Sequence, residues 1–172
     1  MPLNHTSSFA DLTEAQYGAI GKIVVEWSNI EFLLSVLLSR LLRTPEFLGR
    51  TYATGLSAVR LQQAITEAVA IHRHRYGGKR VLPTQLAEID DLNARVTMLR
   101  SERNKISHFC WMRWTDDAVS GTAFAGGVYD KKYESKKTRK LTVTDLKRMH
   151  REAFELTERL MKLTESLPQI DE

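Results

Sequence analysis

The chain has 172 residues, of which 42% are hydrophobic and 27% are charged, and its net charge is +4. These values predict one globular domain, residues 1–172, that can bury a core without disulfides or metals. They exclude a small disulfide-rich secreted module, because Cys110 is the only cysteine. The mild positive charge is compatible with a polyanionic partner.

The sequence gives no sign of a membrane segment or a targeting signal. The longest apolar stretch, residues 30–42, is interrupted by Glu31 and Arg40. Residues 1–10 read as a loose polar leader without the regions of a signal peptide. We therefore expect a cytoplasmic protein without a membrane partner. The histidines and Cys110 lack metal-site spacing, so we expect no metal and no cofactor.

Two helices are predicted in the first third of the chain. The first begins near Asp11 or Thr13, either of which can cap it, and ends near Arg43. Pro45 cannot continue it but can start a short second helix that ends near Gly55. The apolar residues of the first helix step by three and four, as in a bundle: Ile20, Ile23, Trp27, Ile30, Leu34, Leu37 and Leu41.

Two further helices are predicted before residue 108. Ser57 can cap the third, Gly77-Gly78 can end it, and His72 on its apolar side is expected to make an interhelix hydrogen bond. A loop through Pro83 leads to the fourth helix, residues 84–107. The apolar side of the fourth helix consists of Leu86, Ile89, Leu92, Val96, Leu99 and Ile106.

Residues 109–143 have a different pattern and predict a small β-hairpin or meander. An aromatic-rich run is followed by the turn signal Asp116-Asp117. We expect Trp111 and Trp114 to close the core rather than to stack on bases. Thr142 or Thr144 can cap a last helix that ends before Pro168. The predicted fold class is all-α, a four- to five-helix bundle with a small β-hairpin insertion before the last helix.

The fourth helix breaks its own apolar pattern at Arg103. The steps of three and four from Ile89 predict an apolar side chain there, and a charge is costly to bury without a partner. Such breaks concentrate at functional sites. The structural alternative is a salt bridge from Arg103 to another helix, with Glu31 as the obvious partner. His108 would then only interact with the helix C-terminus.

Arg103, Asn104 and His108 form the pattern Arg-Asn-x-x-x-His. This pattern resembles the signature of the HEPN superfamily (higher eukaryotes and prokaryotes nucleotide-binding domains), whose members are helical bundles of about this size and in many cases metal-independent ribonucleases. The resemblance implies RNA cleavage that leaves a 2′,3′-cyclic phosphate and a 5′-hydroxyl. It also implies a homodimer with both motifs in one cleft. A toxin or defence role, with an antitoxin or regulatory protein as partner, is implied by resemblance alone.

The residue types of the motif suit this chemistry, because RNA carries its own nucleophile in the 2′-hydroxyl. His108 can act as base or acid near neutral pH. Arg103 offers a planar fork to phosphate oxygens. Asn104 and Ser107 can orient His108 or bind phosphate, and Glu31 can position Arg103. The motif supplies one histidine per chain, which is little for acid–base work at two oxygens. This favours a site composed of two chains.

The stretch 131–140 combines basic residues with Tyr133, which suits contact with an RNA backbone. A solvated loop or hairpin tip is the alternative. The predicted RNA-binding residues are Lys131, Lys132, Lys136, Lys137, Arg139 and Lys140. Two other functions stay open. One is a non-catalytic HEPN-like module that binds RNA, nucleotide or a partner protein, and the other is a structural adaptor in which the motif is accidental.

Overall fold

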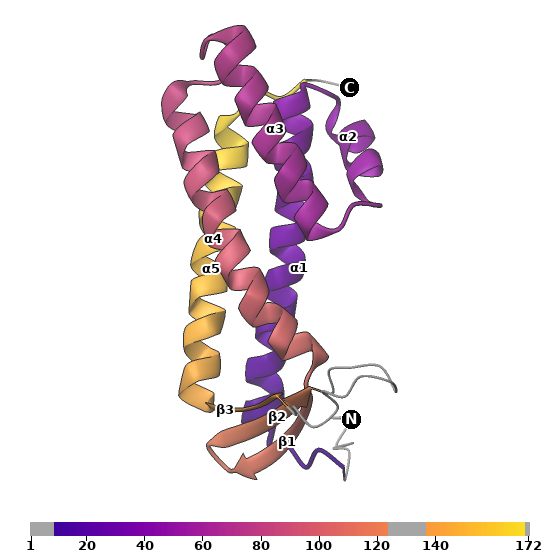
Figure 1. Ribbon diagram of the computed structural model, residues 1–172, viewed down its shortest axis with the longest axis vertical. Coiled ribbons are helices and arrows are strands. Elements are labelled where there is room, and N and C mark those ends of the chain that lie inside the picture. Colours follow the sequence, from indigo (N-terminus) through magenta and orange to yellow (C-terminus); the bar gives the residue numbers. More distant parts are fainter. Residues whose placement is uncertain (1–8, 124–136, 171–172) are drawn as a thin grey trace. The chain divides into compact units, whose positions relative to one another are not determined.

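The computed structural model describes residues 9–123 and 137–170, which are mostly helical with one small antiparallel sheet (Figure 1). The helical class predicted from the sequence is therefore confirmed. No helix in these two ranges is long and apolar enough to cross a membrane. The elements are α1 (Glu14–Leu42), α2 (Glu46–Ala53), α3 (Ala58–Tyr76), α4 (Pro83–His108), β1 (Cys110–Thr115), β2 (Ala118–Ala123), β3 (Lys137–Thr142) and α5 (Val143–Ser166).

The chain divides into two compact units, each with its own hydrophobic core. Unit 1 consists of Met1–Val25 and Arg100–Glu152, and unit 2 of Glu26–Leu99 and Ala153–Glu172. Three helices, α1, α4 and α5, contribute residues to both units. The expectation of a single domain over the whole chain stays a prediction.

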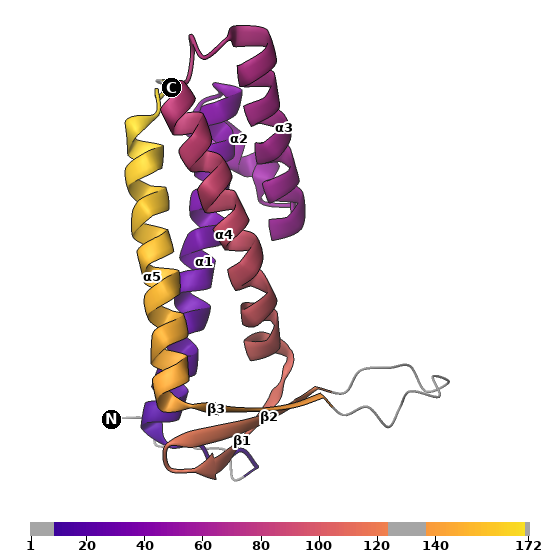
Figure 2. The same ribbon diagram turned by 60° about the vertical axis from the view of Figure 1, so that its left-hand side comes forward.

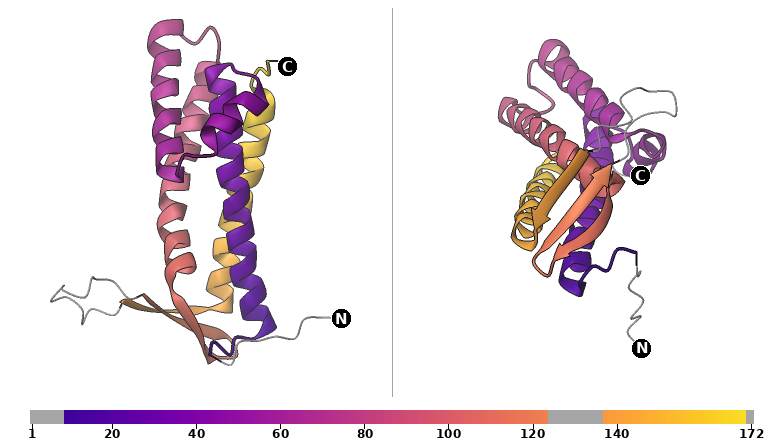
Figure 3. Two further views of the ribbon diagram at one scale, coloured as in Figure 1. Left: turned by 90° about the vertical axis from the view of Figure 1, so that its right-hand side faces the viewer. Right: turned by 60° about the horizontal axis from the view of Figure 1, so that its bottom comes forward.

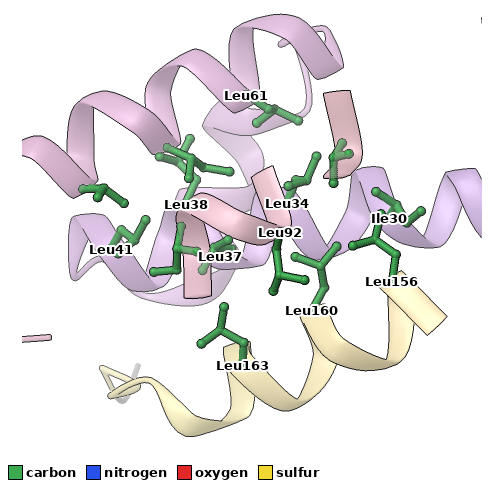
Figure 4. Packing of buried hydrophobic residues seen from close by; sticks show 14 of the residues in the cluster. Ile30, Leu34, Leu37, Leu38, Leu41, Leu61, Leu92, Leu156, Leu160 and Leu163 are labelled. Carbon is green, nitrogen blue, oxygen red and sulfur yellow. The ribbon is translucent and has the colours of Figure 1, made fainter. Parts of the chain in front are cut away.

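Unit 2 is a helical packing around a leucine-rich core, which Figure 4 shows from close by. The parts of the predicted apolar sides of the first and fourth helices that belong to this unit are buried here, with Ile30, Leu34 and Leu92 at 0% exposure. Leu156 and Leu160 of α5 complete the contact. Full burial of one such side chain contributes roughly 1.5–3 kcal/mol, so apolar packing is the main force that holds these helices together.

Buried polar side chains connect the helices of unit 2. The His72 Nε2 of α3 donates a hydrogen bond to the Leu41 carbonyl of α1 at 2.8 Å, which confirms the interhelix bond predicted for this histidine. Gln62 of α3 donates to the Asn93 carbonyl of α4, also at 2.8 Å. Because a buried polar group without a partner is costly, these bonds also specify which helices pack together.

Short-range sequence signals set the helix ends as predicted. The side-chain oxygens of Thr13, Ser57 and Thr142 each accept a hydrogen bond from the backbone N–H three residues on, at 3.3, 3.4 and 3.0 Å. Gly77 ends α3 in the left-handed conformation, with φ of 55°. The predicted ends of α4 and α5 are also close to those observed.

Unit 1 contains a three-stranded antiparallel sheet in the order β1-β2-β3, so of the two predicted alternatives the small meander is observed and the two-stranded hairpin was wrong. The missed strand, β3, pairs with β2 along its whole length, from Ala118 opposite Thr142 to Ala123 opposite Lys137. The sequence hid it because Leu141 is its only strongly apolar residue. Figure 2 shows the sheet against the ends of α1 and α5 that belong to this unit.

The inner side of the sheet closes the core of unit 1. Val119 is 0% exposed, and the Trp111 indole N–H donates to the Ile106 carbonyl of α4 at 2.7 Å. Trp111 therefore closes the core as predicted, but Trp114 is 59% exposed and does not. Trp114 lies at a register shift between Arg113 and Thr115, where the regular pairing of β1 with β2 is interrupted. The other members of this core are Leu12, Ala19, Ile23, Leu141, Leu146 and Met149.

Candidate functional site

The Arg-Asn-x-x-x-His pattern occupies the last turns of α4, within unit 1. The helix ends at His108, where the Phe109 backbone N–H donates to the Lys105 carbonyl at 3.2 Å. Ile106 lies between the motif residues and is 2% exposed in the core of unit 1. This anchor fixes the rotation of the last turn, so the side chains on its other sides are directed to solvent.

The motif residues are brought together on neighbouring rows of one helix end. Asn104, Ser107 and His108 are exposed, and Arg103 is half-buried. Residues four apart lie above one another on a helix, so Asn104 and His108 form one row and Arg103 and Ser107 another. The two rows are about 100° apart around an ideal helix. An imidazole, an amide, a hydroxyl and a guanidinium are thus available on one exposed helix end.

Arg103 lies at the edge of the apolar side of α4, as the broken pattern predicted. Its half-burial agrees with that position. Its Nη1 donates to the Asn104 Oδ1 at 3.3 Å. When the amide oxygen accepts this bond, the Asn104 amide nitrogen keeps its two donors for another acceptor such as a phosphate oxygen. Arg103 and Asn104 therefore present hydrogen-bond donors side by side.

Glu102, which the sequence analysis missed, connects the motif helix to the sheet. Its carboxylate accepts from Lys105 Nζ at 2.6 Å and from Arg139 Nη1 of β3 at 2.5 Å. Burial raises the pKa of Glu102, but the hydrogen bonds and charges of Lys105 and Arg139 together lower it below its ordinary value. The i, i+3 spacing of Glu102 and Lys105 was a visible signal for that ion pair. Nothing in the sequence indicated Arg139 as a second partner of Glu102.

The basic stretch is only partly visible in the structure. Lys131, Lys132 and Lys136 lie outside the described residues, and Lys137 begins β3. Arg139 points to the α4 side of the sheet, where it pairs with Glu102. Lys140 is on the other side, with its Nζ 3.4 Å from the centroid of the Trp114 ring. Arg139 and Lys140 therefore have different surroundings, on opposite sides of the sheet.

Glu31, the predicted partner of Arg103, belongs to unit 2. There it lines a hollow of about 260 Å³ together with Phe32 and Arg50, whose guanidinium carbon lies 4.3 Å from the Phe32 ring centroid. Since Glu31 and Arg103 are in different units, their pairing stays a prediction. Within residues 9–123 and 137–170, no three His, Cys, Asp or Glu side chains are grouped so that they could hold a metal ion.

No protein-family model, curated protein or solved structure matches this chain. The chemical interpretation of the helix end therefore depends on its own residues. Those residues combine an exposed imidazole, a half-buried guanidinium suited to phosphate and an amide donor. This set suits acid–base chemistry at a phosphodiester.

Proposed function

We propose that the chain is a metal-independent endoribonuclease of the HEPN type, in which Arg103 and His108 from two copies form one site. The observation that carries the proposal is the exposed Asn104–His108 row beside the half-buried Arg103, at a helix end anchored by Ile106. This arrangement supplies an accessible proton-transfer group and phosphate-binding donors within about one and a half helical turns.

The proposed reaction is transesterification within the RNA backbone. The 2′-oxygen attacks the adjacent phosphorus, and the bond from phosphorus to the 5′-oxygen breaks. One neutral His108 takes the 2′-hydroxyl proton, and a second, protonated His108 gives a proton to the leaving 5′-oxygen. Arg103 stabilises the negative charge on the non-bridging oxygens. The products are a 2′,3′-cyclic phosphate and a 5′-hydroxyl.

The demand for two copies comes from the acid–base balance of this step. A single imidazole cannot be a neutral base and a protonated acid at the same moment, and each chain brings one His108 to the site. His108 is exposed, so a second copy and a substrate can both approach it. We propose that Asn104 and Ser107 orient His108 or bind phosphate, and that Glu31 positions Arg103.

The setting that we propose is cytoplasmic, with the enzyme acting as a toxin or defence effector and an antitoxin or regulatory protein as partner.

The second candidate function is a module that binds RNA without cleaving it. The exposed Trp114 beside Lys140 favours this candidate, because an aromatic ring and a cation can hold RNA without any catalytic group. Specific RNA binding without cleavage would support it over the enzyme.

The test is cleavage of single-stranded RNA by the purified full chain in EDTA, with analysis of the product ends. We expect cyclic phosphate and 5′-hydroxyl ends, and a loss of roughly 10²–10⁴-fold in rate for His108→Ala. The matched control is His74→Ala, which removes an exposed histidine of α3 and should leave the rate unchanged. Circular dichroism checks that both variants stay helical. An unchanged rate in His108→Ala would remove that residue from the mechanism.

A further inference from the structure

The outer side of the sheet in unit 1, which faces away from the core, carries a large exposed aromatic ring. Strand alternation places Met112 of β1 on this side, at 45% exposure. Trp114 lies where the pairing of β1 with β2 shifts register, and its contact with Lys140 places its ring on the same side, at 59% exposure. Met112 lies opposite Ser120 of β2, which lies opposite Lys140 of β3. Figure 3 (right) shows the three strands side by side in front of the helices of the unit.

Lys140 and Trp114 form a contact that spans the sheet. Their strands, β3 and β1, are the two edges, with β2 between them. The Lys140 side chain passes over β2, where the small side chains of Ala118 and Ser120 leave room, and its Nζ lies 3.4 Å from the Trp114 ring centroid. The cation covers one face of the indole. Trp114 stays 59% exposed, so solvent reaches parts of the residue that Lys140 does not cover.

This combination suits an unpaired nucleotide better than a paired one. A base stacks on an open indole face only when its own face is free, as in single-stranded RNA. The phosphate next to a stacked base is within the range of a lysine on the same ring, and its negative charge complements Lys140. A duplex presents phosphates but hides the faces of its bases, so it could use only the lysine.

We propose that Met112, Trp114 and Lys140, here called the stacking face, bind single-stranded RNA, with one unpaired base on Trp114 and a neighbouring phosphate on Lys140. This inference rests on the proposed function, since it names the form of RNA that the site receives. The stacking face and His108 belong to the same unit, and β1 begins two residues after His108. Stacking tolerates any base, so the face selects for unpaired structure rather than for sequence.

Tryptophan fluorescence tests this proposal directly, because Trp114 is exposed and the other two tryptophans are buried. Trp27 and Trp111 are 1% and 9% exposed, against 59% for Trp114. The full-length His108→Ala variant is titrated with a single-stranded oligouridylate and with a blunt-ended RNA duplex that has no unpaired base. We expect the oligouridylate to quench the tryptophan fluorescence, and to bind about tenfold or more tightly than the duplex.

Three further variants locate the binding by fluorescence anisotropy of labelled RNA. Trp114→Ala should raise the dissociation constant for the oligouridylate roughly 5- to 100-fold, and Trp114→Phe should restore most of the affinity because phenylalanine also stacks. Lys140→Gln should lower the slope of log affinity against log salt by about 0.7, the loss of one phosphate contact. The control is Phe47→Ala, which removes a 73% exposed aromatic of α2.

The outcomes separate this inference from the proposed function. Oligouridylate binding that is unchanged in Trp114→Ala, or equal binding of the duplex, overturns the stacking face even if the wild type cleaves RNA. A change of oligomeric state in Trp114→Ala without a change in RNA affinity also overturns it. If the wild type binds the oligouridylate through Trp114 but does not cleave RNA, the stacking face is supported and the proposed ribonuclease activity is wrong.

Discussion

Arg139 of β3 and Glu102 of α4 form an ion pair, with Nη1 and Oε2 2.5 Å apart, although the two residues are 37 positions apart in the chain. The pair joins the last strand of the sheet to the residue directly before Arg103. Lys105 binds the other oxygen of the same carboxylate at 2.6 Å. The end of the motif helix is thus held by Ile106 on its apolar side and by Glu102 on its polar side.

Glu102→Gln should make unit 1 less stable at neutral pH by about 0.5–1 kcal/mol, since the pair is partly exposed and screened by solvent. The folded state lowers the pKa of Glu102 below its ordinary 4.5. The ionised group therefore contributes stability above about pH 4.5, and this contribution is lost as the pH falls through the lower folded value. Urea unfolding of both proteins between about pH 7 and pH 2 measures the difference, which should shrink in acid.

The control for this experiment is Glu155→Gln, at an exposed glutamate of α5. It should change stability little at any pH. A difference between wild type and Glu102→Gln that stays constant from neutral pH into acid would show that the carboxylate charge does not contribute.

Arg103→Leu should separate stability from activity. Position 103 belongs to the apolar series of α4 and is half-buried, so a leucine there should leave stability unchanged or raise it by up to about 1 kcal/mol. Loss of the guanidinium should lower the rate of RNA cleavage roughly 10²–10³-fold. Denaturant unfolding and the cleavage assay measure the two effects on one preparation.

Arg75→Leu, at an exposed position of α3, is the matched control and should keep the wild-type cleavage rate. The opposite result for Arg103→Leu, a marked loss of stability with full activity, would indicate that Arg103 is a structural salt-bridge residue. That was the alternative interpretation of the broken pattern.

Gly121→Ala should destabilise the sheet of unit 1. A Cβ at this position would lie 2.6 Å from the Trp111 ring and 2.7 Å from the Phe109 ring. Overpacking of this kind costs about 1–3 kcal/mol. The matched control is Gly21→Ala in α1, where nothing lies within 4 Å of the added carbon and stability should rise by about 0.5–1 kcal/mol. Thermal unfolding followed by near-ultraviolet circular dichroism measures both, and a Gly121→Ala protein as stable as wild type contradicts the packing account.

The parts of the fold that the sequence predicted are those set by short-range signals. The steps of three and four predicted the burial of Leu34 and Leu92, because helix periodicity fixes which side meets the core. Ser57 and Thr142 cap the helices as predicted, because a cap needs only residues within one turn. The same local reasoning located the motif at the end of α4.

The parts that were missed depend on contacts between distant residues. The strand β3 looked like a charged loop, since its stability comes from backbone pairing with β2 and from one inward leucine, Leu141. The Glu102–Arg139 pair and the Lys140–Trp114 contact both depend on that strand. Without β3, the sequence does not indicate that Arg139 and Lys140 lie on opposite sides of a sheet.

The measurement that tests the composite Arg103–His108 site most directly is RNA cleavage by a mixed dimer. Wild-type and His108→Ala chains with different affinity tags are co-expressed, and the heterodimer is purified through both tags. We predict cleavage in EDTA by the wild-type homodimer, and a rate lower by roughly 10²-fold or more for the heterodimer and the His108→Ala homodimer, because the step needs one imidazole from each chain. A heterodimer with half the wild-type rate would contradict the composite site, and wild-type cleavage by the His108→Ala homodimer would contradict the ribonuclease assignment of the motif.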